Sequence, residues 1–255
     1  MKKICLIISY DGTDYSGWQR QDNALGIQEV IENLLLEVTG EEVTLKVAGR
    51  TDAGVHANAQ VADFLTNSAI PPEKYIYPLN NFLPHDIRIM KSFEVTEDFS
   101  SRFSALGKHY RYSIYLGEMM PAKLMRYYSL YSYKVDLEKI QKAANVLIGT
   151  HDFKAFEGPY AQMNTSVRTV NDIKITQEGN RIYFDIYGEA FLKNMVRIIV
   201  GTILKANENK ITLEEIEELF VNRDRTKAGI TMPANGLTLE EVYYDWKKYI
   251  INQND

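Results

Sequence analysis

The sequence predicts an α+β protein built from two halves of similar design. Segments with a strand-like alternation of apolar residues are interspersed with segments of helical periodicity along the whole chain. The same strand–helix–strand order occurs loosely in residues 1–104 and again in 105–255, and no low-complexity linker separates them. The length of 255 residues, with 45% hydrophobic and 25% charged residues, is typical of a globular protein with substantial cores.

In the first half, residues 2–10 predict a strand. Apolar residues then recur from Ile27 to Val38 with the spacing of an amphipathic helix, which Gly40 is expected to end. The alternation of apolar residues over 43–47 predicts a further strand that leads into a loop. We also expect strands over 60–65 and 86–93, and a helix over 72–82 that begins at a proline.

In the second half, the alternation of apolar and aromatic residues from Tyr110 to Leu116 predicts a strand. A hairpin is expected from two strands, 167–176 and 181–187, around Gly179-Asn180. Thr212 and Glu215 have the spacing of a capping box at the start of a short helix. The other expected elements are a helix over 137–147 and a long helix over 190–206.

The cysteine content and the hydropathy of the sequence predict the compartment in which the protein occurs. A single cysteine, Cys5, lies in an apolar run, which excludes an intrachain disulfide framework and suits a reducing compartment. The N-terminal apolar run is too short for a signal peptide, and acidic residues follow it at once. No segment approaches the roughly 20 apolar residues that a membrane helix requires. We therefore expect a soluble, cytoplasmic protein with no membrane partner.

The distribution of charge is more informative than the net charge of −5. Residues 102–134 contain six Lys or Arg residues and seven tyrosines, but only one acid, Glu118. Basic residues interleaved with aromatic rings suit a surface that follows phosphates and stacks on bases. A tyrosine-rich strand with a solvated, charged face would give the same pattern, so this feature alone leaves both interpretations open.

The segment 48–57 combines features that a connecting turn does not need. Asp52 lies between Gly49 and Gly54 and is close to Arg50, just after a predicted strand. Glycine allows backbone angles that are closed to other residues and allows a ligand to approach closely. A charged loop tip held by rigid flanks is a common place for catalytic groups. We therefore predict a functional site at Asp52.

A second charged residue of interest is Arg197. It lies in a predicted helix that is apolar on nearly every side and is therefore expected to be largely buried. A partly desolvated guanidinium needs a carboxylate or phosphate partner. Asp52 is an attractive partner because pairing would keep its carboxylate ionised and oriented. Asp185 and Glu189 are the alternative partners.

A metal site and a nucleophilic triad are both poorly supported. Carboxylate and imidazole groups of the right kind occur, but none of them has a diagnostic ligand spacing. The residues considered as ligands are Asp11, Asp14, Asp52, His56 and Asp63. The four histidines are scattered, and none accompanies a Ser or Cys with a matching base. We expect no metal and no cofactor.

The segment 48–57, followed by 60–64, resembles the active-site motif of the TruA family of tRNA pseudouridine synthases. Six further blocks resemble that family and follow in its order. These blocks are 10–21, 83–87, 102–105, 108–112, 149–153 and 191–197. Single blocks are weak signals, but their order along almost the whole chain is a strong one.

The resemblance implies two ferredoxin-like halves whose antiparallel sheets flank a basic RNA-binding cleft, and it implies a homodimer. The implied reaction is the isomerisation of uridine to pseudouridine at positions 38 to 40 of the tRNA anticodon stem-loop, without cofactor or metal. Asp52 is then the nucleophile, attacking either the uracil ring or the ribose anomeric carbon, and Arg197 orients it. Tyr110 stacks on the target base and assists proton removal, while Arg50 helps to replace the flipped base. The expected substrate contacts are Tyr110, Arg50, Arg102, Lys108 and Arg111.

Three departures from the family pattern leave the target positions more open than the chemistry. Ala59 stands where glycine is common, Ser100-Ser101 where histidine and alanine are frequent, and the segment 232–237 lacks a second proline. A paralogue with shifted tRNA targets is therefore one alternative. A non-catalytic tRNA-binding or chaperone protein is another, and a metal-dependent hydrolase would need a ligand cluster that the sequence does not display.

Overall fold

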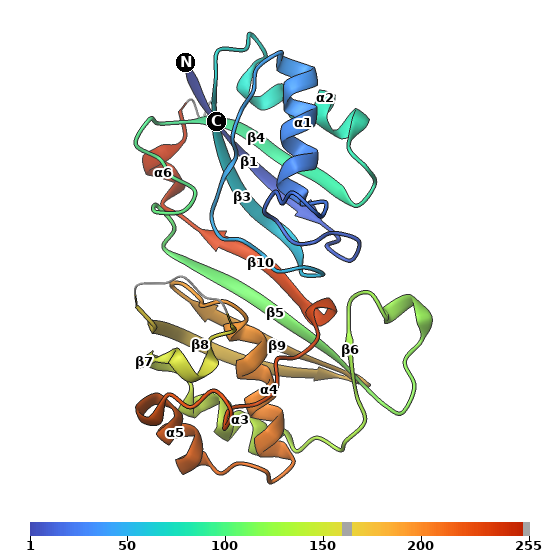
Figure 1. Ribbon diagram of the computed structural model, residues 1–255, viewed down its shortest axis with the longest axis vertical. Helices are drawn as coiled ribbons and strands as arrows, with labels where there is room; N and C mark the ends of the chain where they lie inside the picture. The colour runs from blue at the N-terminus through green and yellow to red at the C-terminus, as the bar shows by residue number, and fades with distance from the viewer. Residues whose placement is uncertain (160–164, 252–255) are drawn as a thin grey trace. The chain divides into compact units, whose positions relative to one another are not determined.

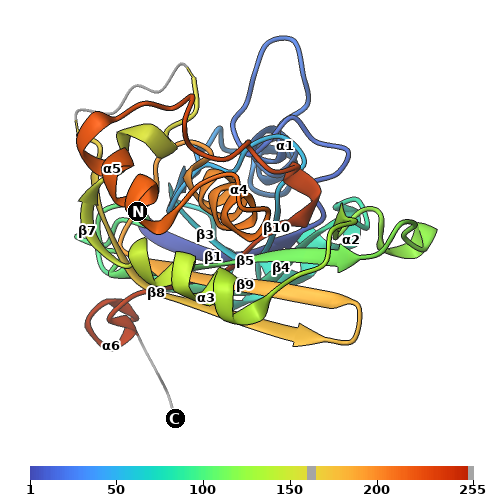
Figure 2. The same ribbon diagram turned by 90° about the horizontal axis from the view of Figure 1, so that it is seen from below.

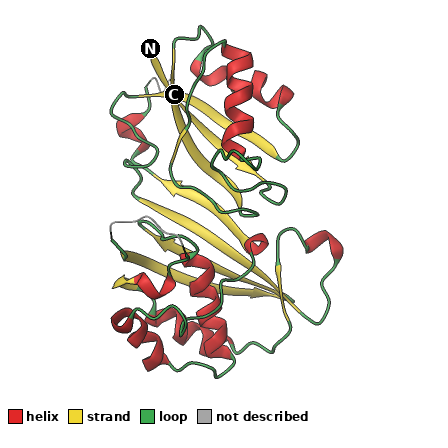
Figure 3. Ribbon diagram, in the orientation of Figure 1, coloured by secondary structure: helices red, strands yellow, loops and turns green. Residues whose placement is uncertain are grey.

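The computed structural model describes residues 1–159 and 165–251, and it confirms the α+β class (Figure 3). The described chain forms two compact units. The first consists of Met1–Leu106 together with the described residues from Leu239 onward, and the second consists of Gly107–Thr238. The last part of the chain therefore returns to the unit that contains its beginning. No helix within the described ranges is long and apolar enough to cross a bilayer.

The sheet of the first unit is built around β1 (Lys2–Tyr10). This strand lies between β3 (His56–Thr66) and β4 (Ile87–Val95) and pairs with both in antiparallel register (Figure 1). The short strand β2 (Lys46–Val47) pairs with β3, and β10 (Leu237–Tyr243) is the next neighbour of β3. The strand predicted over 43–47 was too long, because only its last two residues join the sheet.

Two helices of this unit, α1 (Ile27–Thr39) and α2 (Ile76–Phe82), lie on one face of its sheet (Figures 1 and 2). Gly40 ends α1 with a φ of 74°, as expected for a glycine in the left-handed region. The helix predicted over 72–82 is divided into a 3₁₀ turn, Pro72–Lys74, and α2. The cause is Pro78, which has no N–H and is tolerated only within the first turn of a helix.

The core of the first unit is formed by alternate residues of β1 and the inner stripe of α1. Ile4, Leu6 and Ile8 are fully buried, as are Ile27 and Ile31. The short helix α6 (Trp246–Tyr249) and the residues before it contribute an aromatic cluster. The rings in this cluster are Phe93, Phe99, Tyr244, Trp246 and Tyr249.

The sheet of the second unit has the order β5-β9-β8-β7, and each neighbouring pair is antiparallel. The short strand β6 (Ser129–Tyr131) runs parallel to β5. The bounds of the other strands are Gly107–Leu116 for β5, Gly149–Asp152 for β7, Val167–Glu178 for β8 and Arg181–Gly188 for β9. The predicted hairpin is confirmed, and Gly179 takes a positive φ of 58° at its turn.

In the described part of the second unit, the α-helices are α3 (Leu137–Val146), α4 (Met195–Asn207) and α5 (Leu213–Asn222). The capping box predicted for α5 is present. The long helix predicted from 190 begins only at Met195, because Asn194 has a φ of 61° and a right-handed helix excludes that angle. Short 3₁₀ turns occur at Ala122–Leu124, Phe153–Phe156 and Ala234–Gly236.

Candidate active site

The loop that carries Asp52 is a tight turn fixed to the sheet at its base. The Ala48 N–H donates to the carbonyl of Val61 in β3 at 2.9 Å. At the tip, the Val55 N–H donates to the carbonyl of Asp52 at 3.1 Å, and Gly54 has a φ of 76°. A positive φ at the third position is the feature of a type II turn, which explains the glycine after Asp52. Asp52 itself is half-buried.

The segment after β1 forms a cradle for this loop. The Trp18 N–H donates to the Thr51 carbonyl at 3.1 Å, and the Gly54 N–H donates to the Tyr15 carbonyl at 3.3 Å. Two glycines allow this approach, since a Cβ on Gly12 would lie 2.0 Å from the Val55 carbonyl oxygen. A Cβ on Gly17 would similarly lie 2.6 Å from the Thr51 carbonyl oxygen. The backbone on both sides of Asp52 is thus held by a segment far away in sequence.

In the second unit, Tyr110 lies on β5 opposite Ile186 of β9 and is only 7% exposed. Its ring meets Phe191 edge to face, with a centroid distance of 5.3 Å. Gly188 provides the space for this contact, because a Cβ there would lie 2.8 Å from Cζ of Phe191. Phe191, accommodated by Gly188, therefore packs against the Tyr110 ring.

Arg197 projects from the first turn of α4, and the structure confirms that this helix is buried on nearly every side. Its Nε donates to the carbonyl of Met232 at 2.6 Å, and its Nη1 donates to Oδ1 of Asn194 at 3.0 Å. A guanidinium has its N–H donors in a rigid plane, so these two bonds orient the group. The result is an oriented cation.

The segment 228–232, here called the strap, brings the Met232 carbonyl to Arg197. It crosses α4 at very close range, since a Cβ on Gly201 would lie 2.1 Å from the Ile230 carbonyl oxygen. The Gly229 N–H donates to Oγ1 of Thr202 in α4 at 2.8 Å. Two glycines and a threonine thus seat the strap on the helix.

The sequence model of the family described as tRNA pseudouridine synthase matches residues 6–104 and 143–245. These ranges make up more than half of the chain and include both Asp52 and Arg197. The chain belongs to the tRNA pseudouridine synthase family. The prediction of an isomerase that acts on uridine in tRNA is therefore confirmed. Tyr110 lies between the two matched ranges.

Close relatives match over nearly the full length. The tRNA pseudouridine synthase A of Acetivibrio thermocellus is 48% identical over 245 residues, which is 96% of this chain and 100% of the relative. The protein of the same name from Clostridium acetobutylicum is 42% identical with the same coverage. The Clostridium perfringens protein named tRNA pseudouridine synthase A 2 is 46% identical over 244 residues, with 96% and 100% coverage.

The two units of the synthase each carry part of the predicted site. Arg50, Asp52 and Arg102 belong to the first unit, and Lys108, Tyr110, Arg111 and Arg197 belong to the second. Arg50 is exposed, and Arg102 is exposed with its guanidinium 5.3 Å from the ring of Phe103. Lys108 is half-buried near the start of β5. The grouping of Asp52 with Tyr110 and Arg197 remains a prediction.

Three contributors to the site were missed in the sequence: Phe191, Asn194 and the carbonyl of Met232. The Gly188–Phe191 contact joins residues that are close in sequence, but nothing in the pattern indicates that they enclose Tyr110. Asn194 is one of the few residue types that tolerate a positive φ, which is a weak signal for a helix boundary. A backbone carbonyl has no sequence signal at all.

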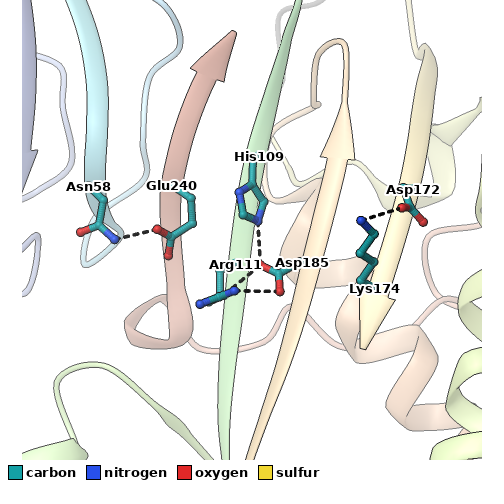
Figure 4. Close-up of polar contacts among 7 residues, drawn as sticks. All are labelled: Asn58, His109, Arg111, Asp172, Lys174, Asp185 and Glu240. Atoms are coloured by element: carbon teal, nitrogen blue, oxygen red, sulfur yellow. Dashed lines mark hydrogen bonds and ion pairs between the residues drawn. The ribbon is translucent and has the colours of Figure 1, made fainter. Parts of the chain in front are cut away.

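Arg111 has a partner on the neighbouring strand. Its Nε and Nη2 donate to the two carboxylate oxygens of Asp185 at 2.8 and 3.0 Å, and Nε2 of His109 lies 2.6 Å from Oδ1 (Figure 4). Burial raises the pKa of Asp185, but the hydrogen bonds from His109 and Arg111 outweigh it and bring the pKa below its usual value. Asp185, considered above as a partner for Arg197, is thus engaged by Arg111 and His109.

Replacing Asp185 with asparagine is expected to lower the free energy of unfolding by about 2 kcal/mol at pH 7, because Arg111 and His109 lose a buried carboxylate partner while Arg111 keeps access to water. Only the ionised form of the Asp185 carboxylate provides this stabilisation. It is fully present above the unfolded carboxyl pKa of about 3.9 and is lost as the pH falls through the lower folded pKa. Urea unfolding at pH 7 and at low pH measures this difference.

The matched control is Asp172→Asn, since Asp172 forms a more exposed ion pair with Lys174 at 3.6 Å (Figure 4). That change is expected to cost less than about 0.5 kcal/mol. Equal losses in the two variants would show that Asp185 contributes no more than a surface pair.

Three of the residues considered as metal ligands accept hydrogen bonds within the first unit. Oδ1 of Asp11 accepts a hydrogen bond from the Thr13 N–H at 3.0 Å, and Nδ1 of His56 accepts one from the Gly12 N–H at 3.1 Å. Asp63 is buried and accepts from the Ser101 N–H at 2.8 Å. Among the described residues, no group of three or more His, Cys, Asp or Glu side chains is placed to hold a metal ion.

The departures from the family pattern differ in exposure. Ser101 is fully buried, and its Oγ donates to the carbonyl of Lys46 at 2.9 Å. Its backbone carbonyl accepts the hydroxyl of Tyr244. Ser101 therefore has an internal structural role in the first unit. Neighbouring Ser100 and Ala59 are half-buried. In the first unit, Asn58 beside Ala59 donates to Glu240 at 2.7 Å (Figure 4).

Some tyrosines of the basic segment 102–134 lie in the core and others lie at the surface. Tyr112 is fully buried, and its hydroxyl donates to the Pro233 carbonyl at 2.8 Å. The ring of Tyr128 is half-buried, with the guanidinium of Arg181 5.6 Å away. Some rings of this stretch thus serve packing and others lie beside cations at the surface, and the RNA-binding interpretation stays a prediction.

Proposed function

We propose that this synthase isomerises uridine to pseudouridine in the tRNA anticodon stem-loop, at positions 38, 39 and 40, with Asp52 as the nucleophile. One observation carries the proposal: a half-buried carboxylate at the tip of a turn whose backbone is held on both sides. A merely connecting loop does not require this construction. The segment 48–57, which resembles the active-site motif of the TruA family, surrounds this same residue.

The chemistry explains why a carboxylate is useful here. The reaction breaks the bond between ribose C1′ and uracil N1, rotates the base and forms a bond between C1′ and C5. The C5 proton leaves and N1 gains a proton, so the product is an isomer and no oxidant or reductant is consumed. Asp52 serves as a transient covalent partner, at the ring or at C1′. Exclusion of water protects the intermediate from hydrolysis.

The other residues position the substrate. The ring of Tyr110 stacks on the target base, an interaction worth roughly 1–3 kcal/mol, and its hydroxyl assists proton removal. Arg197 pairs with Asp52 and orients it, while Arg50 replaces the extruded base in the stem-loop. Arg102, Lys108 and Arg111 contact the RNA backbone. The synthase acts as a homodimer in the cytoplasm, and it needs neither a metal nor a cofactor.

Electrostatics favours an enzyme over a tRNA-binding protein without catalysis. RNA binding draws its affinity from the neutralisation of phosphates by cations. A carboxylate held at a phosphate-binding surface weakens that attraction, so its presence at Asp52 is explained only when chemistry uses it. A non-catalytic chaperone would bind better without it.

Incubation of the protein with unmodified tRNA transcripts, followed by mapping of pseudouridine, tests the proposal. We expect modification confined to positions 38 to 40, unaffected by an excess of chelator. Modification at other uridines would indicate a paralogue with shifted targets. Tight binding without modification would favour the chaperone, and loss of activity in chelator would point to a metal. Sedimentation of the same sample tests the homodimer.

A further inference from the structure

A buried chain of polar side chains connects the central strands of the first unit to the loop that carries Asp52. Tyr10 stands at the end of β1 and is 3% exposed, and Gln60 in β3 is fully buried. The Tyr10 hydroxyl lies 2.7 Å from Oγ1 of Thr51 and 3.3 Å from Nε2 of Gln60. Nε2 of Gln60 also donates to the carbonyl of Gly49 at 2.8 Å.

The directions of these hydrogen bonds follow from the donor inventory. The amide nitrogen of Gln60 has two protons, one for the Gly49 carbonyl and one for the Tyr10 oxygen. The Tyr10 oxygen thus accepts from Gln60, and in the bond between Tyr10 and Thr51 either hydroxyl can be the donor. Burial raises the pKa of Tyr10 to about 12, although the hydrogen bonds with Thr51 and Gln60 act in the opposite direction. The hydroxyl thus stays protonated and able to donate at physiological pH.

The chain holds the loop at the two residues that flank Arg50. Gly49 is fixed through its carbonyl and Thr51 through its side chain, while the Thr51 carbonyl accepts from Trp18. Asp52 is the next residue after Thr51. A buried polar group is costly unless its hydrogen bonds are satisfied. Apolar residues in the places of Tyr10 and Gln60 would not carry that cost. The chain therefore links two buried core residues to the backbone on either side of Arg50.

We infer that Tyr10 and Gln60 are positioning residues that fix the direction of the Asp52 carboxylate for catalysis, although neither touches the substrate. This inference rests on the proposed role of Asp52. Displacement of a catalytic group by about 1 Å reduces the rate by as much as about 100-fold. Loss of the chain is therefore expected to lower the chemical rate while tRNA binding is retained.

The direct test is Tyr10→Phe, which removes only the hydroxyl and leaves the ring beside Trp18, 6.1 Å away between centroids. We expect the single-turnover rate of pseudouridine formation to fall about tenfold while the dissociation constant for tRNA changes less than about twofold. Gln60→Met, which removes both donors at similar length, is expected to have a larger effect. Amide hydrogen exchange should become faster at residues 49–55 in both variants.

Tyr244→Phe is the matched control, because Tyr244 is a buried tyrosine of the same unit whose hydroxyl binds the Ser101 carbonyl. This variant should lose comparable thermal stability, with no change in the single-turnover rate or in the exchange of residues 49–55. An equal loss of rate in Tyr10→Phe and Tyr244→Phe would reduce the role of Tyr10 to stability and overturn the inference.

Asp52→Asn separates this inference from the proposed function. If Asp52→Asn retains activity, the proposed nucleophile is wrong and the positioning role falls with it. If Asp52→Asn is inactive but Tyr10→Phe and Gln60→Met react at the wild-type rate, only the positioning inference fails. Faster amide hydrogen exchange at residues 49–55, together with a slower reaction in Tyr10→Phe and Gln60→Met, supports the positioning role.

Discussion

Asp52→Asn is expected to reduce pseudouridine formation by at least about 10³-fold, as is usual when a group that forms a bond in the reaction is removed. Asparagine has nearly the same size, and the turn depends on the backbone of Asp52 and on Gly54. The fold should therefore remain intact. Affinity for tRNA should stay the same or rise slightly, because one negative charge next to a polyanion is lost. Single-turnover mapping and a binding titration measure the two effects.

Asp98→Asn is the control for the change in charge, since Asp98 is an exposed aspartate of the same unit, outside the Asp52 loop. That variant should match the wild type in rate. Substantial pseudouridine formation by Asp52→Asn would remove Asp52 from the role of nucleophile. Loss of tRNA binding in parallel with the rate would show instead that the residue supports the binding surface.

Local rules account for much of the fold. The strand over 2–10, the helix that Gly40 ends, the capping box and the hairpin each depend on neighbouring residues, and the sequence was sufficient to predict them. The elements predicted with the wrong bounds depend on other constraints. Pro78 moves the start of α2, and Asn194 delays α4, because one residue with restricted or unusual backbone angles overrides the apolar periodicity around it. The periodicity of apolar residues alone does not reveal a helix boundary that such a residue sets.

The turn at Asp52 was predictable, because glycines mark its backbone in the sequence. Glycines beside Asp52 indicated a special turn, and Gly54 does take a positive φ. The cradle was not predictable, because Gly12 and Gly17 are near the loop only after β1 and β3 have paired. The same holds for the strap, which depends on the contact between Gly201 and Gly229. Such contacts are set by tertiary packing, and no local pattern encodes their partner.

Arg197→Met is the second change with a large expected effect. The guanidinium is oriented by the Met232 carbonyl and the Asn194 side chain, both from its own unit. If it pairs with Asp52, its loss should lower the single-turnover rate by at least about 100-fold and leave tRNA affinity nearly unchanged. Without the cation, the protonated carboxyl is favoured, so the acid limb of the pH–rate profile should also move to higher pH.

Two further variants distinguish this electrostatic role from support of the strap. Arg197→Lys keeps the charge but lacks the planar fork, so it should restore the position of the acid limb and only part of the rate. Arg225→Met removes two other hydrogen bonds to the strap, because Arg225 donates to the Gly229 carbonyl at 2.7 Å and to Thr231 at 3.0 Å. It should lower thermal stability and leave the pH profile in place. Loss of a cation paired with the reacting carboxylate must raise the pKa of that carboxylate, so an unmoved profile in Arg197→Met would contradict the proposed pair.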